Sequence, residues 1–465
     1  MKAGAMKAVV AGPAYREMFD PALLPPALRR AALQAETREL DPLNLFNITW
    51  RAGDGRIRHI VLPKALTGVA ANIIVLVGRH FPSGSHKVGP AYTTLLEGEL
   101  EGEITPGENT IIGPSTGNFG IGTAYISRLK GYPAVVVMPD QMSRERYERI
   151  RKYGGRLDLT PGTESDVILV LQRTEQEYRK DPRNKVLAQF ELLPNYRFHR
   201  YVTGKSAIEA ASGYGDGRIA AFVSAPGSAG TLAAADEIKA AFPNSVACAL
   251  EPKECSTLFN NGRGTHRIEG IGDKMVTLIH NVLTTDYVIA IHDDDCVAGL
   301  ELVERRAPLL ERITRVPEGD FASLEGIFGI SGICNVLGAI RLARYLQLGP
   351  DQNVVTIATD GFDRYPSVLA DLERRRGPFV EDTFAQWYEE IFRSASPPQD
   401  VLDVRPRPQK ERLFEYKRQV WTAFGYSESY LAGMKAQSFW DAEFDKISSI
   451  DEALLAIRTL GGERQ

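Results

Sequence analysis

Short apolar runs rich in Val and Ile alternate along this chain with polar stretches of helical periodicity. The apolar runs are bounded by Gly, Pro or Asp and include 73–77, 134–138, 167–171, 219–223, 246–250, 287–291 and 354–358. Continuous apolar runs of this length are typical of parallel strands that are buried on both faces. The stretches between them, such as 143–152 and 231–242, have the spacing of helices. This alternation predicts an α/β fold in which helices cover mostly parallel sheets.

Changes in composition divide the chain into four predicted parts. A chain of 465 residues exceeds the size of one ordinary core, so more than one domain is expected. We predict a leader over 1–60 with a helix at 25–36, a smaller α/β domain over 61–195, a larger one over 196–393, and a linker with a helical tail over 394–465. The last boundary is a proline-rich stretch typical of an extended linker.

The predicted tail is rich in aromatic residues, which are costly to leave in water. They are Phe414, Tyr416, Trp421, Phe424, Tyr426, Tyr430, Phe439, Trp440 and Phe444. We expect both the leader and the tail to pack on the body of the chain. For the tail, packing on a twin subunit and a lid over an active site are the alternatives.

Composition and charge argue against several classes of protein. Hydrophobic residues make up 43% and charged residues 25%, as in globular proteins. A net charge of −4 gives no reason to expect nucleic acid or an anionic membrane as a partner. The N-terminus lacks the pattern of a secretory signal and no apolar run is long enough to span a bilayer, so we expect a cytoplasmic protein. The four cysteines lack metal-ligand or redox spacing, so we expect reduced thiols and no metal site.

Lys87 is the first candidate for chemistry. It lies among Ser and Gly residues after an apolar segment, 72–78, that has the pattern of a buried strand. A lysine in such a place can point into a cleft, lose its proton and attack an aldehyde. The alternative is a solvated surface charge, so the significance of this lysine depends on the motifs that follow it.

A turn of small polar residues, Ser115-Thr116-Gly117-Asn118, follows a strand-like run and precedes a helix. Backbone amides at such a turn, together with the Ser and Thr hydroxyls, form a pocket for a carboxylate. The amide of Asn118 could bond a hydroxyl or a phenolate. An ordinary helix-capping turn is the alternative.

A second turn, Gly227-Ser228-Ala229-Gly230-Thr231, connects an apolar strand to a helix. Its small side chains let the backbone approach an anion, and the helix start supplies unpaired amides and the positive end of a dipole. The turn lacks the lysine of the nucleotide-binding loop and the spacing of the dinucleotide fingerprint, so a single phosphate is a better ligand than ATP or NAD. A plain strand-to-helix turn is the alternative.

Two further segments complete the set of candidate features. Ser331 precedes an apolar helix and by itself has the pattern of a helix N-cap. The loop 359–365 follows the last predicted strand. Ligands of open α/β sheets bind beyond the carboxyl ends of the strands, so this loop is also a candidate to face the cleft.

Taken in order, these five features resemble the pyridoxal-phosphate enzymes of fold type II, the superfamily of tryptophan synthase β and cysteine synthase. The resemblance extends from about residue 62 to about residue 367, and the segments 138–146, 153–155, 251–252 and 269–272 are especially similar to cysteine synthases. It implies two three-layer α/β domains with mostly parallel sheets and the cofactor, pyridoxal 5′-phosphate, in the cleft between them.

The resemblance also implies a role for each candidate residue. Lys87 would hold the cofactor as an internal Schiff base and, once displaced by substrate, act as the base at Cα. The other implied contacts are Asn118 for the 3′ oxygen; Gly227, Ser228, Ala229, Gly230 and Thr231 for the phosphate; Ser331 for the pyridine nitrogen; Gly270 for the loop on the other side of the cofactor; and Ser115, Thr116, Gly117 and Asn118 for the substrate carboxylate.

The implied serine at the pyridine nitrogen bears on the type of reaction. A neutral partner there does not keep the nitrogen protonated, which favours expulsion of a β substituent over transamination. We therefore expect a cysteine-synthase-like β-replacement on an amino acid with a β leaving group, through an aminoacrylate. β-Elimination to a keto acid is the first alternative, and a catalytically silent cofactor-binding module is the second. A homodimer is expected, since twofold assemblies are frequent.

The sequence departs from the cysteine synthases at several positions. Val88 and Gly89 replace the two residues that usually follow the lysine there, and the order Ser85-His86-Lys87 is closer to tryptophan synthase β. His86 could contact the phosphate, with packing or capping as the alternative. Ala229 stands where a glycine is general. These departures leave the identity of the substrate open.

Overall fold

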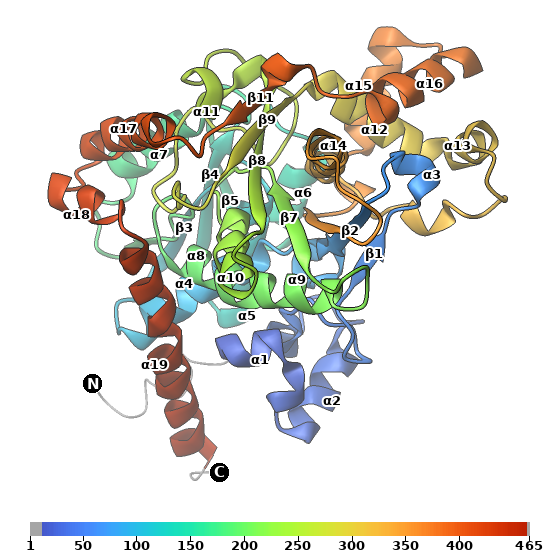
Figure 1. Cartoon of the computed structure of the whole chain (residues 1–465). Helices are drawn as coiled ribbons and strands as arrows, with labels where there is room; N and C mark the ends of the chain where they lie inside the picture. The colour runs from blue at the N-terminus through green and yellow to red at the C-terminus, as the bar shows by residue number, and fades with distance from the viewer. Residues whose placement is uncertain (1–11, 463–465) are drawn as a thin grey trace.

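Two sheets form the centre of the molecule, of which the structure, a computed structural model, describes residues 12–462 (Figure 1). In the larger sheet, β2, β10, β7, β8 and β9 are parallel neighbours, and β1 and β11 pair antiparallel at the two edges. Across this sheet the strands are β1 His59–Val61, β2 Asn72–Val77, β10 Asn353–Ala358, β7 Ile219–Ser224, β8 Val246–Pro252, β9 Tyr287–Ile291 and β11 Val401–Asp403.

The smaller sheet contains four parallel strands in the order β5-β4-β3-β6. Their bounds are β5 Arg156–Thr160, β4 Ala134–Pro139, β3 Thr110–Pro114 and β6 Asn184–Val186. Every residue of β4 is buried, as expected for a central strand that helices cover on both faces. The two sheets confirm the predicted α/β fold with mostly parallel strands.

Helices cover the sheets and form both ends of the described chain (Figure 1). The leader contains α1 Tyr15–Phe19 and α2 Pro26–Ala35, the latter confirming the predicted leader helix. The helices of the body are α3 Lys64–Thr67, α4 Val88–Leu100, α5 Asn118–Lys130, α6 Arg144–Lys152, α7 Val167–Glu177, α8 Pro194–Phe198, α9 Gly204–Ala211, α10 Ala234–Ala241, α11 Thr257–Asn260, α12 Asp293–Arg305, α13 Ala307–Thr314, α14 Ile330–Tyr345, α15 Pro366–Arg376 and α16 Glu381–Tyr388. The tail contains α17 Arg407–Ala423, α18 Glu428–Gly433 and α19 Gln437–Gly462.

One predicted strand is wrong. The apolar run 167–171 forms the first turns of α7 rather than a strand. Within the run, Val167, Val170 and Leu171 are buried while Leu169 is 44% exposed, which is the one-sided burial of a surface helix. A short apolar run does not by itself distinguish a strand from a helix, because neither periodicity can be recognised in it. Here the helical pattern of apolar and polar residues appears only after the run ends.

The strand before Lys87 belongs to the larger sheet. β2 pairs in register with β10, which lies almost 300 residues later in the chain, and strands β3 to β6 form the smaller sheet. The chain therefore enters the larger sheet first, leaves it after β2 to build the smaller sheet, and returns at β7. The division into domains at about residue 195 stays a prediction.

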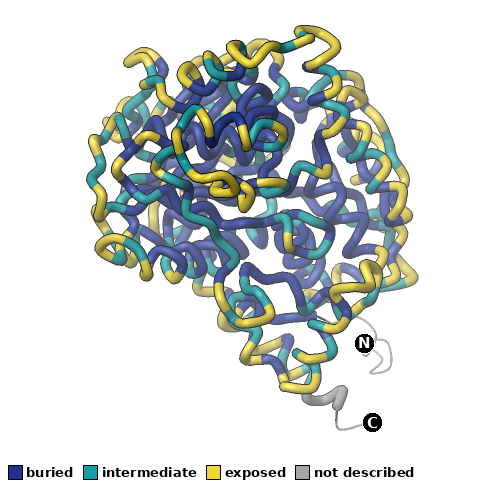
Figure 2. Tube along the Cα trace, turned by 90° about the vertical axis from the view of Figure 1, so that its right-hand side faces the viewer, coloured by how far each residue is buried: buried dark blue, intermediate teal, exposed yellow. Residues whose placement is uncertain are grey.

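Both ends of the described chain pack on its body. The backbone N–H of Tyr15 in the leader donates to Asp451 of α19 at 2.7 Å, and the Tyr15 hydroxyl donates to Glu97 of α4 at 2.6 Å. Trp421 of α17 donates its indole N–H to the carbonyl of Val276 at 2.9 Å. Buried residues run continuously through the interior in Figure 2, and Trp421 and Trp440 of the tail belong to a core cluster with Phe190, Leu278 and Ile279.

The remaining expectations from composition concern cysteines, metals and membranes. Cys248, Cys255, Cys296 and Cys334 are all buried and free. Within residues 12–462, no group of His, Cys, Asp and Glu side chains is arranged to hold a metal ion. Among the same residues, no helix has the length and apolar character needed to cross a membrane.

Candidate active site

Lys87 lies where three strands of the larger sheet end. It follows β2 and directly precedes α4, and its neighbour Ser85 forms an isolated bridge with Asp360 beyond β10. Its side-chain nitrogen donates to the hydroxyl of Ser228, beyond β7, at 3.1 Å. The carboxyl ends of parallel strands share one edge of a sheet, which is why residues so distant in sequence meet here.

The environment of Lys87 favours a neutral amine. The side chain is half-buried, and burial lowers its pKa to about 8, although Asp273 and Glu164 act in the opposite direction. An amine with its pKa near neutrality is a far better nucleophile toward an aldehyde than a solvated lysine, which is almost wholly protonated. The alternative of a solvated surface charge for Lys87 is therefore wrong.

The turn 227–231 joins β7 to a short 3₁₀ turn, Thr231–Ala233, and α10. Among the described residues, the backbone N–H groups of Gly227, Ser228 and Ala229 have no protein acceptor. Three unpaired amides ahead of a helix start are the arrangement that binds a phosphate. The Thr231 hydroxyl is engaged with Ser224 at 2.8 Å, which ties the turn to the strand before it.

Close packing explains the glycines of this turn. A Cβ at Gly227 would lie 2.6 Å from the carbonyl oxygen of Gly270, and a Cβ at Gly230 would lie 2.2 Å from the side-chain oxygen of Asn195. Ala229 between them has a φ of 65°, in the left-handed region that a glycine adopts at less cost. The departure from glycine at position 229 is therefore accommodated with backbone strain.

Gly270 and Ser331 lie side by side near the turn. Gly270 has a φ of 99°, and a Cβ there would point at the Ser331 hydroxyl, 4.0 Å away, and at a guanidinium nitrogen of Arg146, 3.9 Å away. Ser331 lies in the first turn of α14 and is 2% exposed. The N-cap of α14 is Gly329, two residues before Ser331, so the N-cap role considered for Ser331 from sequence alone is wrong.

The turn 115–118 is held by its own side chains. The Ser115 hydroxyl accepts the backbone N–H groups of Gly117 at 3.0 Å and Gly120 at 2.8 Å, which fixes the start of α5. The Thr116 hydroxyl donates to Glu164. A Cβ at Gly117 would lie 1.7 Å from a guanidinium nitrogen of Arg146, so only glycine fits there. The turn both caps a helix and lies against a buried charge.

Asn118 connects this turn to the loop beyond β10. Its amide N–H donates to Asp360 at 2.6 Å, and its amide oxygen accepts from the guanidinium of Arg364 at 2.8 Å. Tyr365 donates to the same carboxylate of Asp360 at 2.8 Å. The loop 359–365 therefore lies against the turn 115–118 and orients the Asn118 side chain.

His86 is enclosed between other rings. It stacks on Trp50 with ring centroids 5.7 Å apart and meets His199 edge-on at 5.0 Å. Burial lowers the pKa of His86 well below its usual value, and the charge of Lys87 acts in the same direction. His86 is therefore a neutral, packed ring beside Lys87, consistent with the packing alternative.

Sequence reasoning missed a buried charge network at the centre of the site. Arg146 of α6 pairs with Glu269 at 2.8 Å, lies 3.7 Å from Glu164, and donates to the hydroxyl of Tyr365 at 2.9 Å. Burial raises the pKa of Glu164 to about 7, against the opposing effects of Arg146, Thr116 and Gly270. Arg146 and Glu269 do lie in segments similar to cysteine synthases, but nothing in their local sequence separates them from solvated charges.

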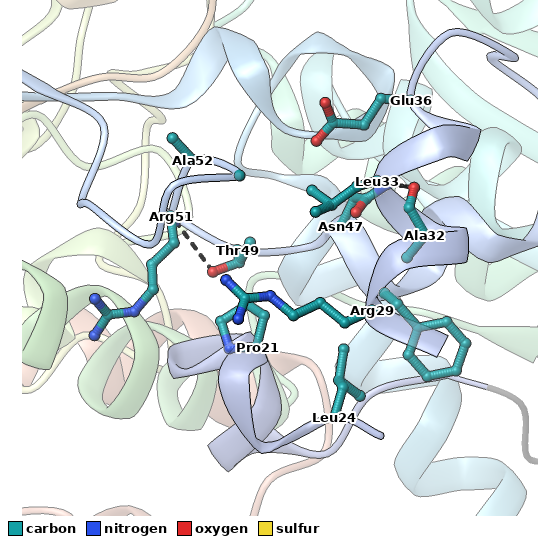
Figure 3. Close-up of a pocket in the computed structure, with 12 residues that line it drawn as sticks. Pro21, Leu24, Arg29, Ala32, Leu33, Glu36, Asn47, Thr49, Arg51 and Ala52 are labelled. Carbon is teal, nitrogen blue, oxygen red and sulfur yellow. Dashed lines mark hydrogen bonds between the residues drawn. The ribbon is translucent and has the colours of Figure 1, made fainter. Parts of the chain in front are cut away.

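A hollow elsewhere on the molecule does not share this chemistry. It lies between the leader helix α2 and the segment 46–53, and it is lined by residues including Leu24, Arg29, Asn47 and Thr49 (Figure 3). It contains none of the predicted site residues. The predicted residues meet instead at the strand ends beside Lys87.

Comparison with known proteins agrees with this site. The model of the family "pyridoxal-phosphate dependent enzyme" matches residues 66–360, and the chain belongs to this family. A cysteine synthase of Staphylococcus aureus is 31% identical over 300 residues, which cover 64% of this chain and 88% of that protein. A probable cysteine synthase of Bacillus subtilis is also 31% identical over 300 residues, with 64% and 89% covered. The structure of a hydrogen sulfide-producing enzyme of Fusobacterium nucleatum matches with 27% identity and a TM-score of 0.56, over 72% of this chain and 92% of that chain.

The described residues fit pyridoxal 5′-phosphate, the cofactor of this family. The cofactor carries an aldehyde at one end and a phosphate at the other. Lys87 offers a half-buried amine with a lowered pKa for the aldehyde, and the unpaired amides of the turn 227–229 offer donors for the phosphate. The 3.1 Å bond between Lys87 and Ser228 shows that the two groups border the same space.

Proposed function

We propose that this enzyme catalyses a cysteine-synthase-like β-replacement, in which a nucleophile takes the place of a leaving group on the β carbon of an amino acid. The observation that supports the proposal most directly is the bond between the Lys87 amine and the phosphate turn, in a chain 31% identical to a cysteine synthase over 300 residues. The cofactor, when bound, supplies the electron sink that acidifies the Cα proton. The other steps depend on where this chain places its own groups.

We assign the substrate carboxylate to the turn 115–118. The Ser115 hydroxyl and the bond from Thr116 to Glu164 hold this turn in one shape before any substrate binds. A preformed site of this kind binds with little loss of conformational entropy. The charge of Arg146 beside Gly117 adds a favourable potential for an anion.

We assign the removal and return of the Cα proton to Lys87. Its pKa of about 8 leaves a substantial neutral fraction at physiological pH, so the amine can accept this proton and later return it. The partial burial of the side chain limits the access of bulk water to this proton.

We assign the ring nitrogen and the 3′ oxygen of the cofactor to Ser331 and Asn118. A serine hydroxyl is neutral, so it does not stabilise a protonated ring nitrogen as a carboxylate would. Asn118 keeps one amide hydrogen beyond its bonds to Asp360 and Arg364, and that hydrogen is available to an acceptor. Gly270 leaves room for a flat ring beside Ser331.

The reaction is tested by incubating the purified, cofactor-loaded enzyme with O-acetylserine and sulfide. We expect cysteine and acetate in equal amounts, and no product from the Lys87→Ala variant. Pyruvate and ammonia formed without sulfide would assign β-elimination instead. No product with any activated serine would contradict both reactions and favour a silent cofactor-binding module.

We also propose that the enzyme is a cytoplasmic homodimer, since twofold assemblies are the commonest oligomers of soluble enzymes. Light scattering of the purified protein tests the second part of this proposal. A molar mass of twice that of the chain, 51.3 kDa, is expected, and the mass of a single chain would contradict it.

A further inference from the structure

The carboxyl group of Asp273 is buried and has no hydrogen-bond partner among the described residues. It follows the loop that contains Gly270 and is 5% exposed. Among the described residues, neither of its side-chain oxygens has a hydrogen-bond partner. An unpaired carboxyl group in a protein interior is strongly destabilising, and natural sequences keep one mainly where function requires it.

The backbone around Asp273 fixes where its side chain lies. The hydroxyl of Thr257 donates to the carbonyl of Asp273 at 2.6 Å, and the N–H of Gly272 donates to the carbonyl of Pro226 at 3.0 Å. Pro226 directly precedes the phosphate turn. These two bonds attach the loop to the turn proposed to hold the cofactor phosphate. The Asp273 carboxyl group extends from this loop.

The charged groups that act on Asp273 belong to the active site. Burial raises the pKa of Asp273 well above its usual value, the carboxylate of Glu164 acts in the same direction, and Lys87 acts in the opposite one. Asp273 in turn has the largest charge effect on Lys87. Cys255 is a further titratable group that senses Asp273. Asp273 also lines one hollow together with Gly227 and Ala229 of the phosphate turn, and the Ser228 hydroxyl of the same turn accepts from Lys87 at 3.1 Å. The carboxyl group therefore lies beside the turn that contacts the Lys87 amine.

We propose that Asp273 is the acid–base residue for the β substituent, an inference that rests on the proposed β-replacement. As the bond between Cβ and the leaving group breaks, the leaving group departs with the electron pair and takes the proton of the Asp273 carboxyl group. As the new bond to Cβ forms, the resulting carboxylate accepts the proton of the incoming nucleophile. The Asp273 carboxyl group is thereby regenerated, while Lys87 removes and returns the proton at Cα.

This role also specifies the class of nucleophile. A carboxylate in an enclosed site repels an anion such as hydrosulfide and assists a neutral molecule that must lose a proton to react. The preferred nucleophile is therefore a neutral thiol, alcohol, amine or water. Hydrosulfide already lacks the proton that Asp273 would remove, so its reaction depends little on this residue.

The test uses the cofactor-loaded enzyme with Asp273→Asn, and Asp382→Asn as control, since Asp382 is an exposed carboxyl group on α16. O-Acetylserine is supplied with either 2-mercaptoethanol, a neutral thiol, or sulfide. The step compared is the addition to Cβ, followed as decay of the intermediate that forms before the nucleophile is added, so departure of the leaving group does not enter the comparison. In this step the Asp273→Asn variant should lose about 10²-fold in rate with the thiol, the usual contribution of one acid–base group, and less than about threefold with sulfide. Equal losses with both nucleophiles, or no loss, would overturn the proposal.

Two measurements other than activity separate this role from a structural one. The Asp273→Asn variant should unfold at the same or a higher temperature, because the amide replaces a buried carboxyl group that makes no hydrogen bond among the described residues; a clearly lower temperature would overturn the proposal. The pH midpoint of the visible cofactor band should fall, because a carboxylate near Lys87 is lost; an unchanged midpoint would overturn it. If the wild-type enzyme forms no β-substituted product, the proposed function fails, and these two measurements still decide whether Asp273 acts on Lys87.

Discussion

The side-chain nitrogen of Lys87 lies 3.1 Å from the hydroxyl of Ser228, although 141 residues separate them in the chain. This contact joins the amine that reacts with an aldehyde to the turn that binds a phosphate. A cofactor that carries an aldehyde and a phosphate on one small molecule can use both groups at once. The predictions that follow test this arrangement and the segments that support it.

The rate of cofactor capture by the cofactor-free protein should depend on pH through Lys87. Only the neutral amine attacks an aldehyde, and the pKa of Lys87 is about 8. Below about pH 8 the capture rate should rise about tenfold for each pH unit, and above it the rate should level off. Stopped-flow absorbance of the visible cofactor band measures this rate. A rise that continues to the ordinary lysine pKa of about 10.4 would contradict the inferred environment.

Gly117→Ala should impair substrate binding. The new Cβ would lie 1.7 Å from a guanidinium nitrogen of Arg146, so either the turn 115–118 or the arginine must move. We expect KM for the amino-acid substrate to rise about tenfold, equivalent to about 1.4 kcal/mol. Gly213→Ala is the matched control, because no atom lies within 4 Å of its added Cβ. Equal KM values for the two variants would show that the turn does not bind substrate.

Ala229→Gly should relieve strain in the phosphate turn. Ala229 adopts a φ of 65°, which costs an L-residue about 1–2 kcal/mol. Glycine avoids this cost, but part of the stability gained is lost because glycine has more conformational freedom in the unfolded chain. We expect the free energy of unfolding to rise by up to about 1 kcal/mol. Chemical denaturation of the cofactor-free protein measures it. A loss of stability would mean that the side chain of Ala229 contributes packing that outweighs the strain.

Lys417→Met should destabilise residues 277–280, which lie between the tail and the phosphate turn. The buried ammonium of Lys417 donates to the carbonyls of Leu278 and His280, and the hydroxyl of Thr277 donates to the carbonyl of Ser228. Methionine would leave the two buried carbonyls unpaired, at a cost of about 1–3 kcal/mol each. We expect lower stability and weaker cofactor binding, measured by thermal unfolding and by titration of the visible band.

The control for the tail is Lys435→Met, which removes an exposed lysine that pairs with Glu411 and lies over the ring of Phe414. Such surface pairs contribute about 0–1 kcal/mol. If the two variants bind the cofactor equally well, the tail does not support the phosphate turn. The residues that support the phosphate turn would then all lie in the body of the chain.

The parts of the account that the sequence predicted depend on local patterns. Strand ends mark where loops face a cleft, and glycine-rich turns before helices mark anion sites, so Lys87 and the turn 227–231 could be found without a structure. The run 167–171 was misassigned because a short apolar run lacks a period of its own. The pairing of β2 with β10 depends on contacts between distant segments, which no local pattern specifies.

The buried charges could not be predicted in the same way. Arg146, Glu164 and Asp273 have ordinary polar neighbours in sequence, and a charged residue is exposed in most proteins. Their burial results from the packing of α6, the loop after β5 and the loop after α11 against one another. Only the assembled structure shows which of these charges have partners and that Asp273 has none among the described residues.

The most direct test of the central claim is the site of covalent attachment. The cofactor-loaded enzyme is treated with borohydride, which fixes the cofactor to the amine that holds it, and the digested protein is analysed by mass spectrometry. The account predicts one modified lysine, Lys87, and no modification in the Lys87→Ala variant. Attachment at a different lysine, or retention of the adduct in that variant, would contradict the account.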